Sequence, residues 1–215
     1  MNRTIKILKD TAHSLIAAKK INELNTSSFI ELKAYASHNN KYFYNVKVLS
    51  SKNAITHYDR LTKCIVFDIN KDCINKKGKY TSFFHELGHH IDWELGLISN
   101  NNDFKNIILK ECKLLMDRID INTLTSYISK EARTNGLSDI LSGTTNNSVA
   151  FKYKHTRSYW KGSAMRLPFE TFAHFYEALT RKDNFKIELY RKFLPNSYNM
   201  FLFFINNNQK LDMII

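Results

Sequence analysis

The chain has 215 residues, with 32 Lys and Arg against 20 Asp and Glu, which gives a net charge of +12. The basic residues are scattered rather than gathered in blocks, so the charge reflects a general richness in Lys, Asn and Ile and does not indicate nucleic acid as a partner. The 3 cysteines are odd in number and have no Cys-x-x-Cys spacing, so neither a disulfide framework nor a cysteine zinc site is indicated, and a reducing compartment is the simpler inference.

The N-terminal segment has no signal-peptide pattern, because charged residues interrupt positions 1–10 every few residues. The longest strongly apolar run, at 200–205, is far too short to span a bilayer. We therefore expect a cytoplasmic protein without a membrane partner, with a phage-encoded origin or delivery by a non-classical route as further settings. The length favours a single domain over residues 1–215.

The first part of the chain is expected to contain helices followed by strands. Residues 3–24 carry apolar side chains at a rough 3.6 period and predict an amphipathic helix, and 27–37 predict a second, short helix. Runs of β-branched and aromatic residues then predict strands at 44–49, 57–61 and 64–69. An exposed strand edge beside a cleft could pair with the extended backbone of a substrate.

A His-Glu-x-x-His motif follows the predicted strands, at His85, Glu86 and His89. Two histidines four residues apart lie on one face of a helix, so both can turn a ring nitrogen toward one zinc ion. The carboxylate of Glu86 beside them could take the proton of an attacking water molecule, which is the general-base part of metal-assisted hydrolysis. Thr81 or Ser82 is expected to cap this metal helix at its N-terminus.

The rest of the chain reads as mostly helical. Apolar periodicity predicts helices at 103–120, from there to about 132, from Leu167 onward, at 184–193 and at 196–207. Between 136 and 160 the periodicity is weak, which predicts irregular structure with one helical turn around 139–141.

A catalytic zinc site normally has three protein ligands and one open position, so one ligand remains to be found. A histidine six residues after His89 is absent, because Leu95 holds that position. Asp139 lies in a Gly-x-x-Asp-x-x-x-Gly segment of the kind that can supply an aspartate ligand. Glu170 and His174 share one face of a later helix. These three residues are the candidates for the third ligand.

The segments 85–92 (HELGHHID) and 170–175 (ETFAHF) together resemble the gluzincin metallopeptidases of the anthrax lethal factor catalytic domain and the clostridial Pro-Pro endopeptidases. The segments 136–140 and 155–160 also resemble metallopeptidase domains of phage head-associated proteins. The resemblance covers roughly 60–207.

This resemblance implies an α+β, mostly helical, zincin-like metalloprotease domain with a small N-terminal sheet and two metal-ligand helices. Residues 1–55 lie outside the resemblance and are expected to form an N-terminal helical extension with the first strand, whereas 98–160 would be an inserted helical and loop region.

The resemblance also implies roles for particular residues. It points to Glu170 as the third zinc ligand and to Tyr159 as the donor that stabilises the oxyanion, with His155, Tyr153 and Tyr176 as alternative donors. His174 stands where lethal factor has an acid, so it is a further candidate for orienting the ligands. Independently of the resemblance, Asp92 lies three residues after His89 and is expected to accept the other ring N–H of a ligand histidine.

The sequence therefore predicts a zinc-dependent endopeptidase that uses Zn²⁺ as cofactor and Glu86 as base to hydrolyse an extended protein or peptide. The alternative is a zinc-binding structural or interaction protein, associated with a phage particle or mobile element, that cleaves nothing relevant. Glu86 argues against this alternative, because a structural site has no use for a base and is usually closed by four protein ligands. A third hypothesis, a basic nucleic-acid-binding domain, would show a steep loss of DNA affinity with salt.

Overall fold

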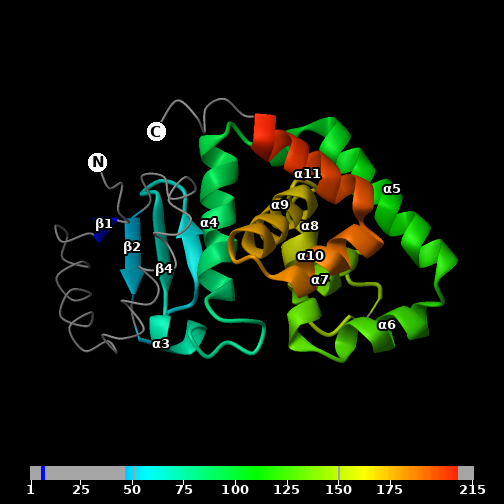
Figure 1. The fold of residues 1–215 in the computed structure, drawn as a ribbon, viewed down its shortest axis with the longest axis horizontal. Coiled ribbons are helices and arrows are strands. Elements are labelled where there is room, and N and C mark those ends of the chain that lie inside the picture. Colours follow the sequence, from blue (N-terminus) through cyan, green and yellow to red (C-terminus); the bar gives the residue numbers. More distant parts are fainter. Residues whose placement is uncertain (1–5, 8–46, 51, 150, 208–215) are drawn as a thin grey trace.

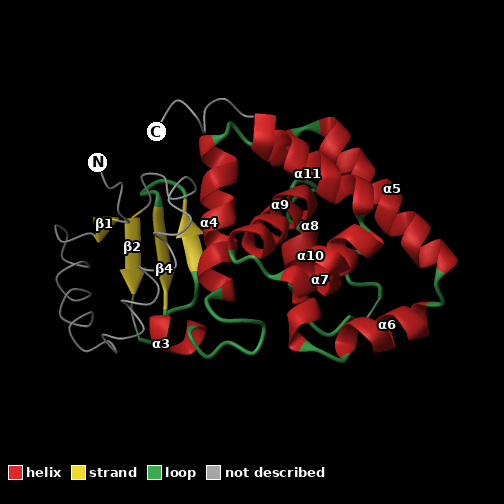
Figure 2. Ribbon diagram, viewed as in Figure 1, coloured by secondary structure: helices red, strands yellow, loops and turns green. Residues whose placement is uncertain are grey.

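The computed structural model describes residues 6–7, 47–50, 52–149 and 151–207 (Figure 1). In this part of the chain a small sheet lies at one end of a larger body of helices (Figure 2). The expected α+β, mostly helical class is therefore confirmed. The helix expected at 3–24 is wrong at Lys6–Ile7, which form the short strand β1 because they pair with a neighbouring strand. The remainder of that helix and the helix expected at 27–37 lie outside the described residues.

The described strands form one four-stranded sheet in the order β1-β2-β4-β3. Strand β2 (Lys47–Ser50) runs parallel to both β1 and β4 (Cys64–Phe67), whereas β3 (His57–Asp59) is antiparallel to β4. The residues of β4 are mostly buried, as expected for β-branched and aromatic side chains in an inner strand. The strands expected at 57–61 and 64–69 are confirmed in place but end earlier, and β3 forms an edge of the described sheet.

Helix α4 (Thr81–Glu94) is the predicted metal helix, and it packs between the sheet and the helical body (Figure 1). Its apolar side chains are almost completely buried; they are Phe83, Phe84, Leu87 and Ile91. One face of α4 is therefore committed to the core, as its sequence pattern predicts.

The N-terminus of α4 is capped differently from the prediction. Neither Thr81 nor Ser82 is the cap; the residue before the helix is Tyr80, which has a φ of 57° and makes no capping bond with its side chain. The carboxylate of Asp72, at the end of α3 (Ile69–Asp72), instead accepts from the backbone N–H groups of Ser82 at 3.1 Å and Phe83 at 2.8 Å. A buried carboxylate at this position satisfies free N–H groups and complements the positive end of the helix dipole.

We expect Asp72→Ala to lower the free energy of unfolding by about 1–2 kcal/mol, because the first turn of α4 loses its acceptor. Urea unfolding followed by circular dichroism measures the change. The control is Asp117→Ala, an exposed acid in a helix, which is expected to shift stability by less than about 0.5 kcal/mol. Equal stability of the two variants would show that the Asp72 cap contributes nothing.

The helices predicted after α4, at 103–120, from there to about 132, from Leu167 onward, at 184–193 and at 196–207, are all present in the structure. The helical elements after α4 are η2 (Ile98–Asn100), α5 (Asn102–Arg118), α6 (Ile121–Ser129), η3 (Ala132–Thr134), α7 (Asn135–Thr144), α8 (Arg157–Lys161), α9 (Arg166–Thr180), α10 (Asn184–Phe193) and α11 (Pro195–Asn207). Helix α9 lies in the middle of this body and packs against α4, α7, α10 and α11. Among the described residues, no helix is both long enough and apolar enough to cross a bilayer.

The expectation of irregular structure at 136–160 is wrong at both ends, because α7 is a regular helix of 10 residues and the short helix α8 begins at Arg157. Nearly every residue of α7 is buried, both the large apolar ones such as Leu137 and Ile140 and the small ones such as Ser138 and Gly143. A helix enclosed on all sides has no exposed polar face, so its sequence does not show the amphipathic period that marks a surface helix.

Helix α9 is also buried on both of its sides. Its polar side chains Glu170, His174 and Glu177 are all buried, as are most of its apolar ones. Glu177 forms an ion pair at 2.8 Å with Lys186, and both side chains are fully enclosed. The polar residues of α9 thus belong to the interior, where each needs a partner.

Candidate metal centre and its cleft

Two helices, α4 and α9, carry the side chains of the predicted metal site, and they cross closely at Gly88. A Cβ atom at Gly88 would lie 2.7 Å from the Cα of Ala173 in the backbone of α9, which is closer than real Cβ contacts allow. Glycine therefore permits a helix approach that a larger residue would prevent. Because Gly88 lies between His85 and His89 in sequence, the close crossing brings both histidines next to α9.

The side chains of His85, His89 and Glu170 meet at one point. The Nε2 atom of His85 lies 3.0 Å from Oε2 of Glu170, and Nε2 of His89 lies 3.6 Å from the same oxygen. The three ligand atoms are all within 4.8 Å of one another, an arrangement that could hold a metal ion. Two imidazole nitrogens and one carboxylate oxygen are a donor set found in catalytic zinc sites.

The charge state of Glu170 suits a metal ligand. Its side chain is 2% exposed, and burial opposes ionisation, but the neighbouring histidines outweigh burial and hold the pKa of Glu170 well below its usual range. The group is therefore a carboxylate at neutral pH, which is the form that binds metals. Its other oxygen, Oε1, accepts a hydrogen bond from the Tyr159 hydroxyl, so Oε2 remains toward His85 and His89.

Tyr159, the predicted oxyanion donor, thus contacts the predicted ligand Glu170 directly. Burial, and then the Glu170 carboxylate, raise the pKa of Tyr159, so the hydroxyl keeps its proton and donates. The guanidinium of Arg166 lies 4.2 Å above the tyrosine ring and also donates to the Tyr159 carbonyl oxygen. The ring of His155 stacks on Tyr159 at a centroid distance of 4.2 Å. These contacts fix the orientation of the tyrosine.

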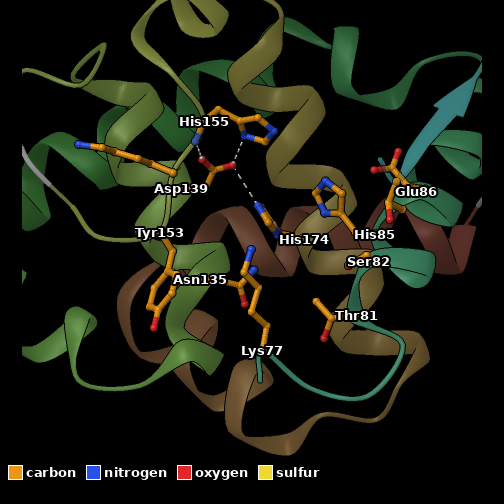
Figure 3. A pocket seen from close by; sticks show the side chains of 12 residues that line it. Lys77, Thr81, Ser82, His85, Glu86, Asn135, Asp139, Tyr153, His155 and His174 are labelled. Atoms are coloured by element: carbon orange, nitrogen blue, oxygen red, sulfur yellow. Dashed lines mark hydrogen bonds and ion pairs between the residues drawn. The ribbon is translucent and has the colours of Figure 1, made fainter. Parts of the chain in front are cut away.

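Asp139, the alternative ligand, lies in α7 and joins two histidines (Figure 3). Its carboxylate accepts from the backbone N–H of His155 and from Nδ1 of the same residue, both at 2.7 Å, and contacts Nε2 of His174 at 3.2 Å. Burial opposes ionisation here too, but the hydrogen bonds from the histidines lower the pKa of Asp139. Asp139, His155 and Glu170 also form a group that could hold a metal ion, although Asp139 is not grouped with His85 and His89.

His174 lies beside the metal-binding group rather than in it. Its ring centroid is 4.4 Å from that of His85, and its Nε2 is engaged by Asp139. Burial, and then the charge of His85, lower the pKa of His174 to about 4, so the ring is neutral at physiological pH. The pKa of His155 shifts the other way. Burial lowers it, but the hydrogen bond to Asp139 and the nearby carboxylates of Glu170, Asp139 and Glu86 together outweigh burial, so the net shift is upward.

Asp92 does not make the contact that was predicted for it. Its buried carboxylate accepts from the backbone N–H of Ser99 at 2.9 Å and from the Ser99 hydroxyl, so it fixes the turn between α4 and η2. The Nδ1 atoms of His85 and His89 are buried without a hydrogen-bond partner in the described part of the chain. The ring of His89 instead stacks on Phe169 at 4.1 Å, a contact that the sequence did not predict because no local pattern connects two residues so far apart in the chain.

A cavity of about 230 Å³ opens beside the metal-binding group (Figure 3). It is lined by Thr56, Lys77, Thr81, Ser82, His85, Glu86, Asn135, Asp139, Tyr153, Lys154, His155 and His174. Glu86 therefore faces space that a substrate could enter, next to the two motif histidines. Of the alternative donors, His155 and Tyr153 line the cavity, whereas Tyr176 is fully enclosed and stacks on Phe172 in the core.

Comparison of the chain with protein-family models, with curated proteins and with solved structures finds no match. The resemblance to gluzincin and phage head-associated metallopeptidases therefore stays a prediction. What the site does has to be argued from its own geometry and chemistry.

Proposed function

We propose that the protein is a zinc-dependent endopeptidase whose metal is held by His85, His89 and Glu170. The observation that carries this proposal is the convergence of three ligand atoms from α4 and α9 beside a cavity that is lined by one of the three ligand residues, His85, and by Glu86. A structural zinc site is usually closed by a fourth protein ligand, whereas a three-ligand site beside a cavity leaves a position for a reactant.

The side chains around the metal-binding group have separate tasks in this proposal. A zinc ion bound there supplies Lewis acidity toward the substrate carbonyl and lowers the pKa of water. Glu86 accepts the proton of the attacking water and passes it to the departing amine. Tyr159 holds Glu170 in place through its hydrogen bond.

His155 is the donor that we assign to the oxyanion of the tetrahedral intermediate. It lines the cavity, and its Nδ1 is engaged by Asp139, which leaves Nε2 as the second nitrogen of the ring. Because the pKa of His155 is raised, the ring carries a proton on Nε2 more readily than an isolated histidine does. A proton-bearing nitrogen held by a buried carboxylate is suited to stabilise developing negative charge.

An extended peptide is the substrate class that fits the surroundings of the cavity. Thr56 lines the cavity and immediately precedes β3, which forms an edge of the described sheet. A peptide that pairs with this edge would run toward the cavity, and its main-chain hydrogen bonds would give affinity with little demand on sequence.

Metal analysis tests the proposal first. Protein purified with added zinc is expected to contain about one zinc ion per chain, and His85→Ala and His89→Ala are expected to lose it. Elemental analysis after desalting measures the content. His57→Ala, which removes an exposed histidine of β3, is the matched control and should keep the zinc. A wild-type protein that retains no zinc would refute the proposed site.

A further inference from the structure

One wall of the cavity carries two polar side chains for which the catalytic proposal has no use. They are Lys77, from the loop before α4, and Asn135, the first residue of α7. Both reach into the cavity, on the far side of His174 from Glu86 (Figure 3). They are therefore placed to contact a part of the substrate other than the bond that is cleaved.

The ammonium group of Lys77 has no ion-pair or hydrogen-bond partner within the described ranges, and its side chain is half-buried. The loop that presents it is firmly held. The backbone N–H of Lys77 donates to Oδ1 of Asn75 at 3.0 Å, and Arg181 of the α9 C-terminus donates to the carbonyl oxygen of Lys79 at 2.8 Å. The fold thus holds an unpaired positive charge at the edge of the cavity.

The second side chain is an unsatisfied buried amide. Asn135 is only 5% exposed, and its Oδ1 atom has no hydrogen-bond partner among the residues that the structure describes. Buried polar atoms in folded proteins are nearly always paired, and an unpaired one is costly. An acceptor of this kind, facing a cavity, indicates that its partner is a donor on the ligand.

We propose that Lys77 and Asn135 form a subsite that binds a carboxylate-bearing residue of the peptide, an inference that rests on the proposed function. Lys77 pairs with the carboxylate, and Oδ1 of Asn135 accepts a backbone N–H. The carboxylate comes either from an Asp or Glu side chain or from the C-terminus of the peptide, because both present the same group. A basic side chain at the same place is repelled by Lys77.

The other charges of the cavity are consistent with this selectivity. Two acids line the cavity in the described part of the chain: Glu86, which the catalytic proposal uses as base, and Asp139, whose carboxylate is already occupied by His155 and His174. The lining also contains a second, exposed lysine, Lys154. The positive charge of Lys77 is therefore not cancelled on its own side of the cavity.

Binding to a hydrolysis-deficient protein tests the subsite without relying on turnover. The full chain carrying Glu86→Gln is loaded with zinc, immobilised, and exposed to N-acetylated octapeptide mixtures made in four forms. One position is Glu or Gln, and the C-terminus is a free acid or an amide, while the other positions are a mixture of uncharged residues. Mass spectrometry of the retained peptides gives the ratio of charged to neutral forms.

We expect the carboxylate forms to be retained about tenfold more than their neutral counterparts, as is usual for a hydrogen bond to a charged group. If peptides with Glu are retained more than those with Gln, the subsite binds a side-chain carboxylate. If free-acid peptides are retained more than amidated ones, it binds the C-terminal carboxylate. Adding Lys77→Met should abolish the preference, and Lys77→Glu should reverse it, so that the neutral forms are retained more than the carboxylate forms. Lys76→Met, in the same loop but exposed and outside the cavity, should leave it unchanged.

Equal retention of all four forms would overturn the subsite, and so would a preference that survives Lys77→Met. Thermal unfolding of each variant, followed by circular dichroism, separates a lost preference from a lost fold. If the preference depends on Lys77 but zinc-loaded wild-type protein cleaves none of the retained peptides, the subsite stands and the proposed hydrolysis fails. The two proposals are thus tested by different readings of one set of peptides.

Discussion

Glu86→Gln is expected to lower the rate of peptide hydrolysis at least about 100-fold while zinc content and folding stay unchanged. The amide has almost the same shape as the carboxylate but cannot accept the proton of the attacking water, and general-base catalysis typically contributes about 10²- to 10⁴-fold. Glu86 is not among the three clustered ligand residues, so its replacement should leave the metal in place. Mass spectrometry of a proteome-derived peptide library, digested by zinc-loaded wild type and variant, measures the cleavage of many sequences at once.

The matched control is Glu94→Gln at the end of the same helix. Glu94 forms an ion pair with Lys63 at 2.6 Å and does not line the cavity, so its replacement should leave turnover unchanged. Full turnover in Glu86→Gln would exclude Glu86 as the base. A wild-type protein that binds zinc but cleaves nothing in the library would favour the non-catalytic alternative, a zinc-binding interaction protein.

Glu170→Gln is expected to weaken zinc binding by more than about 100-fold. Loss of a group that only supports a ligand typically costs 10- to 100-fold, and loss of a ligand itself should exceed that range. The neutral amide keeps the size of the side chain and can still interact with Tyr159, so the packing of α9 is largely preserved. Competition with a fluorescent zinc chelator measures the affinity of each variant.

Asp139→Asn separates the two candidate ligands. Because Asp139 engages His155 and His174 and is not grouped with the motif histidines, this variant should still bind about one zinc ion per chain. The opposite pattern, with zinc lost in Asp139→Asn and kept in Glu170→Gln, would move the third ligand from α9 to α7. Both variants remove one negative charge from a buried acid, so the comparison is balanced.

The metal helix could be predicted from sequence because its signals are local. The spacing of His85 and His89 and the apolar pattern between them depend only on the period of a helix. Glu170 is different, since no local rule connects it with a motif so far away in the chain; spacing on a helix face left it among three candidates, and only the resemblance to a family favoured it. The structure adds that Gly88 and Ala173 allow the two helices to approach.

Features that depend on tertiary contacts could not be predicted. The cap of α4 comes from Asp72, because a carboxylate outside the helix competes successfully with Thr81 and Ser82 for the free N–H groups. Helix α7 was missed because it is enclosed on all sides and therefore has no exposed polar face. Without such a face, its sequence lacks the alternation of apolar and polar residues by which a surface helix is recognised. Asp92 was assigned to a histidine by its spacing, but the turn after α4 brings Ser99 closer to it.

The close crossing at Gly88 also links metal binding to the conformational stability of the whole chain. His85 and Glu170 are separated by 85 positions, so their ligand atoms meet only after α4 and α9 have docked, and an unfolded chain offers no such cluster. An ion that binds the native state alone adds RT ln(1 + [M]/Kd) to the free energy of unfolding. A metal ion bound at this cluster would therefore raise the free energy of unfolding as its concentration increases, as well as fill the site.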